Sequence, residues 1–219
     1  MEPVNFYHHC LRVINPGTGS KWTQIESAYS RRAYHNLAHL REMLGHYTAQ
    51  LTNTPPVLQP RSATAPAALL SKKEALWGLA LIYHDIVYTA SRRDNEAKSA
   101  DLLVKDLLAI GASEEDGAYC HRLIMATKSH QLLEGSDHSD ALLIDLDLAV
   151  LARPADGYDA YAKAVRREFK IYPNCLYKPG RKKALQHFIE QPLIYHLQES
   201  RDKWEASARI NIQREIDSF

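Results

Sequence analysis

Apolar residues recur along this chain at three- and four-residue spacings, and the strict alternation typical of strands is hard to find. Between Tyr34 and Gln50, for example, Leu40 and Leu44 lie one turn apart and would share a helical face. The pattern predicts helices before Pro16 and over about 34–50, 75–88, 95–108, 113–130, 142–151, 156–170, 180–190 and 200–216. These elements predict an all-α fold, a compact helical bundle.

Two segments indicate how the bundle is organised. The segment from Ala75 to about Tyr88 is apolar on almost every side and follows a Ser71–Glu74 capping box, so we expect a central, buried helix. The segment 51–68 holds four of the ten prolines and predicts an irregular, Pro-rich connection. Because the candidate metal ligands lie on both sides of this loop, we expect residues 1–219 to form a single domain.

Composition adds limits to this picture. With 45% hydrophobic and 24% charged residues among 219, the chain is typical of a globular protein. A formal net charge of +1 gives no broad field that would favour nucleic acid or a membrane surface as a partner. Three scattered cysteines favour a reducing compartment, and the start lacks the pattern of a signal peptide, so we expect a cytoplasmic protein. Composition leaves the oligomeric state open.

The candidate chemistry begins with His84 and Asp85, which lie near the end of the most apolar predicted helix. Burying a carboxylate there is costly unless it is paired or binds a metal. The alternative is a capped helix end with a hydrogen-bonded core histidine. The dipeptide alone leaves both interpretations open.

Two further pairs would extend the set. His35 and His39 are four residues apart, so on a helix they would share a face and could reach one metal, or one could handle a proton. The alternative is a polar helix surface. Asp145 and Asp147 interrupt an apolar helix, and since neighbours two apart diverge, only one would be a ligand and the other a cap or ion-pair partner.

Taken together, the imidazoles and carboxylates form a mixed nitrogen and oxygen donor set. Such a set suits a divalent ion, and Zn, Mn, Fe, Ni and Mg all stay open, although imidazoles argue against a site built for Mg alone. Ligands that project inward from bundle helices are a recurring arrangement. A bound ion would lower the pKa of its water and clamp a phosphoryl oxygen.

The order His39, His84-Asp85, Asp147 resembles the signature of the HD superfamily, which is all-helical and includes many metal-dependent phosphohydrolases. Wider segments are similar to predicted HD phosphohydrolases of unassigned substrate, over Tyr83–Tyr88, Asp94–Ala100, Ala126–His130 and Asp145–Leu148. The resemblance implies a bundle of the HD-domain type in which His39, His84, Asp85 and Asp147 hold a metal ion.

A second likeness concerns Tyr34-His35-Asn36-x-x-His39, which resembles an element of the cyclic-nucleotide phosphodiesterases, a branch of the same superfamily. There the second histidine binds metal and the first protonates the leaving oxygen, which implies His39 as a ligand and His35 as a general acid. In that branch Leu follows the last Asp ligand within an Ala-Asp-Leu-Ser stretch, which Asp147 fits better than Asp145. The rest of the phosphodiesterase pattern is missing, so a cyclic-nucleotide substrate is not implied.

Four residues are candidates for second-shell or substrate roles. These are Glu96 as a base or outer support, Lys128 as a phosphate-binding cation, His130 as a ligand to a second metal, and Asp145. The alternative for His130 is a histidine at a helix end, and the alternative for Lys128 is a solvated side chain. Arg31-Arg32, Arg92-Arg93 and Arg166-Arg167 could likewise place a guanidinium on a phosphate, or be plain surface.

The sequence thus predicts a metal-dependent phosphohydrolase with a metal-bound water as nucleophile and a phosphate ester or nucleotide as substrate. His35 would protonate the leaving group, and Asp85 could also orient the water. The alternatives are a hydratase or di-iron oxygenase on the same scaffold, or a non-catalytic nucleotide-binding module. Neither a membrane nor a nucleic acid is expected as a partner.

Overall fold

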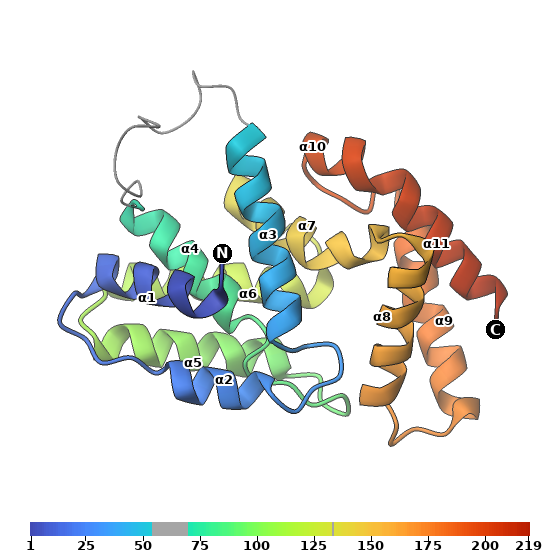
Figure 1. Ribbon diagram of the computed structural model, residues 1–219, viewed down its shortest axis with the longest axis horizontal. Helices are drawn as coiled ribbons and strands as arrows, with labels where there is room; N and C mark the ends of the chain where they lie inside the picture. Colours follow the sequence, from blue (N-terminus) through green and yellow to red (C-terminus); the bar gives the residue numbers. More distant parts are fainter. Residues whose placement is uncertain (54–69, 133) are drawn as a thin grey trace. The chain divides into compact units, whose positions relative to one another are not determined.

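The computed structural model describes residues 1–53, 70–132 and 134–219 (Figure 1). Within these ranges the chain is helical and contains no strand, which confirms the predicted all-α class. Contacts divide it into two compact units, residues 1–31 with 35–129 and residues 32–34 with 130–219. The single domain stays a prediction.

The first unit contains six helices of the described chain, from α1 to α6. They are α1 (Pro3–Ile14), α2 (Trp22–Tyr29), α3 (Leu37–Asn53), α4 (Lys72–Tyr83), α5 (Asn95–Ala109) and α6 (Glu114–Ser129). Helix α4 packs against α1, α5 and α6. Every residue from Ala75 to Tyr83 is buried, so α4 is the central helix that its apolar sequence predicts.

Local signals explain where several helices begin. The Ser71–Glu74 capping box opens α4, with the Ser71 N–H donating to Glu74 at 2.7 Å and the Glu74 N–H to Ser71 Oγ at 3.2 Å. Ser113 and Asp116 make the same reciprocal bonds at the start of α6. Gly78 lets α1 approach α4 closely, since a Cβ there would lie 2.6 Å from Cys10 Sγ.

The second unit contains the remaining described elements. They are α7 (His138–Leu148), the 3₁₀ turn η1 (Ala149–Ala152), α8 (Ala155–Glu168), α9 (Asn174–Glu190), α10 (Gln198–Ser200), the π-helical turn η2 (Arg201–Glu205) and α11 (Ala206–Asp217). Helix α11 packs on α9 and η1. Arg181 of α9 donates to both Glu215 oxygens of α11 at 2.9 and 3.0 Å, and Tyr158 of α8 donates to the same carboxylate at 2.6 Å.

Some predicted boundaries are wrong. Helix α3 begins at Leu37 instead of Tyr34, and α4 ends at Tyr83, well before Tyr88, because the Ile86 N–H returns to the Tyr83 carbonyl and closes a turn. Helix α9 begins at Asn174 and runs through Pro179, which lies within its first two turns, where the missing N–H removes a single helical bond. Helix α2 was not predicted at all.

The predicted Pro-rich loop is described only in part. Its first residues, 51–53, belong to α3, and the rest lies outside the described residues. In the described parts of the chain, no helix is both long and apolar enough to cross a membrane.

Candidate metal centre

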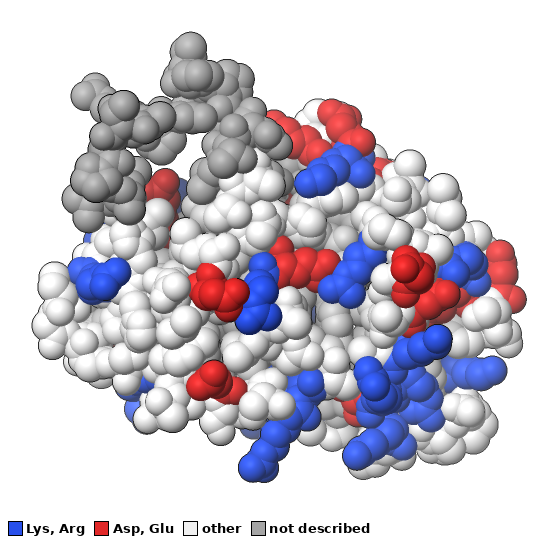
Figure 2. Space-filling model, in the orientation of Figure 1, with Lys and Arg blue, Asp and Glu red and all other residues white. Residues whose placement is uncertain are grey.

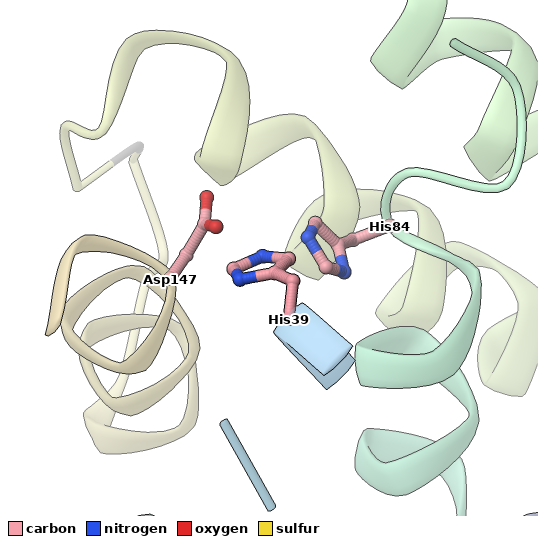
Figure 3. A group of neighbouring side chains, drawn as sticks. All are labelled: His39, His84 and Asp147. Carbon is pink, nitrogen blue, oxygen red and sulfur yellow. The ribbon is translucent and has the colours of Figure 1, made fainter. Parts of the chain in front are cut away.

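His39 and His84 are brought together at the ends of two helices of the first unit. Asn36 starts α3 by accepting the Ala38 N–H on its side chain at 2.8 Å and the His39 N–H on its carbonyl at 3.1 Å, so His39 lies in the first turn. His84 is the residue at which α4 ends. Both side chains are buried, and their ring centroids are 5.5 Å apart (Figure 3).

The hydrogen bonds of His84 decide what its other ring nitrogen offers. Its Nδ1 lies 2.8 Å from the Leu81 carbonyl, which can only accept, so Nδ1 carries the proton. In the neutral imidazole, Nε2 then presents a lone pair, and this nitrogen is 3.1 Å from Asp85 Oδ2. A lone pair and a carboxylate oxygen at that distance repel each other, and either a metal ion or a second proton between them would turn the repulsion into attraction. The pair therefore has the chemistry of a cation site.

His35 lies before α3, in the turn at residues 34–36, and the prediction that it shares a helical face with His39 is wrong. The reason is that Asn36 starts the helix one residue after His35. The turn nevertheless keeps His35 close, because its ring stacks on Tyr88 at 4.0 Å and its Nε2 is 3.9 Å from Asp85 Oδ2. An imidazole held there can move a proton near the carboxylate.

Asp145 and Asp147 of α7 contact different groups, as their two-residue spacing predicts. Asp145 is fully buried and accepts the backbone N–H groups of His196 at 2.8 Å and Leu197 at 2.9 Å. Burial raises the pKa of Asp145, and these two hydrogen bonds act in the opposite direction. Asp147 is half-buried, and its Oδ2 is 3.4 Å from His130 Nε2. Asp145 therefore anchors the chain before α10, whereas the Asp147 carboxylate lies beside His130.

His39, His84 and Asp147 are a group of residues that could hold a metal ion, since each offers one ligand atom. Figure 3 labels these three side chains, the two imidazoles from α3 and the end of α4, and the carboxylate from α7. Two imidazoles and one carboxylate are a donor set that divalent transition metals favour, and Asp85 lies next to this group, 3.1 Å from His84.

The other candidate residues play smaller parts. Glu96 is half-buried in the first turn of α5 and Lys128 is exposed in the last turn of α6. Within the described residues, neither of these side chains forms a hydrogen bond or an ion pair. His130 follows α6 with a positive φ of 54°, which ends that helix.

Two of the arginines proposed for phosphate binding, Arg92 and Arg166, form hydrogen bonds within the chain. Arg92 donates twice to Asp94, at 2.7 and 2.8 Å, so Asp94 stands at the start of α5 without the side-chain cap that the sequence predicts. Arg166 donates to two backbone carbonyls and to Asn174. Arg166 therefore has a structural role, whereas Arg92 forms an exposed ion pair.

Two contributors to the site went unassigned in the sequence. The Asn36 cap could have been found, because Asn directly before an apolar-periodic segment is a signal for a helix start. The Leu81 carbonyl fixes the proton on His84 Nδ1. This contact could not have been predicted, because the sequence does not show which backbone carbonyl accepts a given hydrogen bond.

A comparison of the chain with protein-family models, curated proteins and solved structures finds no match. The resemblance to the HD superfamily therefore rests on the motifs and on the His-His-Asp group.

Proposed function

We propose that this protein is a metal-dependent phosphohydrolase with an HD-type centre. The observation that carries the proposal is the buried His39–His84 pair, in which His84 presents Nε2 beside the Asp85 carboxylate. His39, His84, Asp85 and Asp147 would hold one divalent ion. Such an ion supplies a nucleophilic water at neutral pH and stabilises charge on a phosphoryl oxygen.

Two side chains would protonate the leaving group and orient the acid. His35 would donate a proton to the leaving oxygen, because its Nε2 lies 3.9 Å from Asp85 Oδ2, at the edge of the proposed ligands. Tyr88 would hold the imidazole in orientation through the stacked contact at 4.0 Å. The substrate class we propose is a phosphate ester or a nucleotide.

The test combines metal analysis with a substrate screen. Native protein is expected to carry about one divalent transition metal per chain and to hydrolyse some member of a panel of phosphomonoesters, phosphodiesters and nucleotides. His84→Ala should lose both properties. His121→Ala is the matched control, because this histidine lies on α6 and pairs with Asp101 at 3.7 Å.

Four results would count against the proposal. Metal-free native protein, or full activity in His84→Ala, would remove its basis. Turnover that depends on oxygen and yields no phosphate would assign the centre to another reaction. Nucleotide binding without turnover in any divalent metal would indicate a binding module.

A further inference from the structure

The hairpin formed by α8 and α9 concentrates positive charge. Residues 163–183 contain eight Lys and Arg against one Glu, a net charge of +7, although the whole chain is only +1. Figure 2 shows blue side chains gathered in the lower right of the view, where α8 and α9 lie. The near-neutral total therefore hides a strongly basic surface.

Most of these cations are available to a partner. Arg166 and Arg181 are used inside the second unit, by backbone carbonyls and by Glu215. Five others are exposed and, in the part of the chain that the structure describes, have no carboxylate within 4.0 Å: Lys163, Arg167, Lys170, Lys178 and Lys183. A charge patch of this kind attracts an anionic surface.

Two large aliphatic side chains project from the tip of the same hairpin. Ile171 is 71% exposed and Leu176 is 62% exposed. The tip is fastened, because Arg166 donates to the Tyr172 carbonyl at 3.0 Å and to Asn174 Oδ1 at 2.9 Å. The aliphatic groups are thus held in water by a well-bonded loop, so a partner that covers them beside the cations would gain the burial of both side chains.

We propose that the α8–α9 tip docks on the surface of an anionic lipid bilayer. Lysine and arginine side chains around the tip would meet the headgroups, while Ile171 and Leu176 would enter the boundary with the acyl chains. A nucleic acid would account for the cations but not for the two exposed aliphatic side chains, and the hairpin's aromatic rings pack on one another, with Phe169 6.2 Å from Tyr172 and 6.0 Å from Tyr177 between centroids. The combination favours lipid, and it is independent of the proposed metal chemistry.

The primary experiment is co-sedimentation of the full chain with vesicles of phosphatidylcholine, with and without 30 mol% phosphatidylserine, together with two double variants. Binding to the anionic vesicles only is expected. The double variant Lys170→Gln, Lys178→Gln should weaken binding to anionic vesicles about 25-fold, since each cation near such a surface raises the affinity about fivefold. Ile171→Asn with Leu176→Asn should weaken it at least about tenfold, through lost apolar insertion.

Matched controls and a site-specific probe locate the contact. Ile210→Asn on α11 changes an aliphatic residue that is 68% exposed, and Lys105→Gln on α5 removes an exposed cation; neither should alter binding. Cys175, in the first turn of α9, is exposed while Cys10 and Cys120 are buried, so a polarity-sensitive dye can be attached there alone. Its emission should shift to the blue with anionic vesicles.

The proposal is overturned by any of three results. These are no binding to anionic vesicles, binding that both double variants retain, or binding to labelled oligonucleotides with none to vesicles. A loss of vesicle binding in the aliphatic variant, with native thermal unfolding, would support insertion of the tip.

Discussion

Replacing the two aspartates near the end of α7 one at a time separates a metal ligand from a structural anchor. Asp145 is buried and bonded to the backbone of His196 and Leu197, whereas Asp147 is half-buried and its Oδ2 lies 3.4 Å from His130 Nε2. We expect Asp145→Ala to lower stability and leave metal affinity nearly unchanged. We expect Asp147→Ala to weaken metal binding and leave stability nearly unchanged.

The magnitudes follow from the hydrogen bonds. A bond to a charged group contributes about 1.5–3 kcal/mol, so losing two would cost about 3–6 kcal/mol. Because both donors are part-buried and regain some water, we expect the lower end, about 3 kcal/mol. For a domain of this size that shifts Tm down by about 6–12 °C. Asp145→Asn keeps one acceptor oxygen and should lose about half as much.

Metal affinity should fall in Asp147→Ala and stay nearly unchanged in Asp145→Ala. Losing a residue that merely supports a ligand weakens binding about 10–100-fold, so losing the Asp147 carboxylate should reach at least the upper end. Thermal unfolding followed by circular dichroism measures stability, and competition with a fluorescent chelator measures affinity. If Asp145→Ala lost the metal with unchanged Tm, or Asp147→Ala kept affinity within tenfold, the assigned roles would be reversed.

Three further changes test the fold around the site. Gly78→Ala should destabilise by about 1–3 kcal/mol in denaturant titration, because the new Cβ would lie 2.6 Å from Cys10 Sγ; full stability would contradict the close packing. Glu215→Leu should cost about 3–5 kcal/mol by leaving a buried guanidinium without its carboxylate, and a loss below 1 kcal/mol would refute this. Burial raises the pKa of Asp116, but the bonds from Lys72 and the start of α6 outweigh it, and the pKa lies below 3.8. Its stabilisation is therefore present above pH 3.8 and lost as pH falls through the folded pKa, so Asp116→Asn should flatten the acid side of a stability–pH curve; an unchanged slope would contradict the shift.

How much of the fold the sequence predicts depends on whether the signal is local. The reciprocal bonds at Ser71 and Ser113 lie directly before the helices they open, and the predicted starts differ from the observed ones by three residues for α4 and by one for α6. Helix α2 is eight residues long with Ile25 and Tyr29 as its buried residues, which is too short a pattern to recognise. Helix α9 begins ahead of Pro179, where Arg166 bonds Asn174 across the hairpin, and such a tertiary contact is invisible in a sequence.

The same distinction holds for the candidate site. His84 is predicted from its position at the end of an apolar helix and His39 from its spacing with His35 and the family resemblance, and the structure brings the two rings together. The choice between Asp145 and Asp147 stayed open in the chain itself, although the family resemblance favoured Asp147, because the partners of Asp145 are backbone groups about fifty residues away. The total charge does not reveal the basic hairpin, because the rest of the chain offsets the positive charge of residues 163–183.

The electrostatics of the first unit explain why the proposed centre needs its carboxylates. His84 ends α4, where unpaired carbonyls give a partial negative charge that favours a cation, but His39 lies in the first turn of α3, where partial positive charge opposes one. The two helix ends, each about half an elementary charge, nearly cancel. Neutral imidazoles add no charge, so a divalent ion would be balanced by the carboxylates alone. Asp85 supplies one negative charge beside His84 Nε2, and Asp147 would supply the second. In the proposed centre the aspartates would supply the charge that balances the ion, while the imidazoles would add two ligand bonds and favour a transition metal.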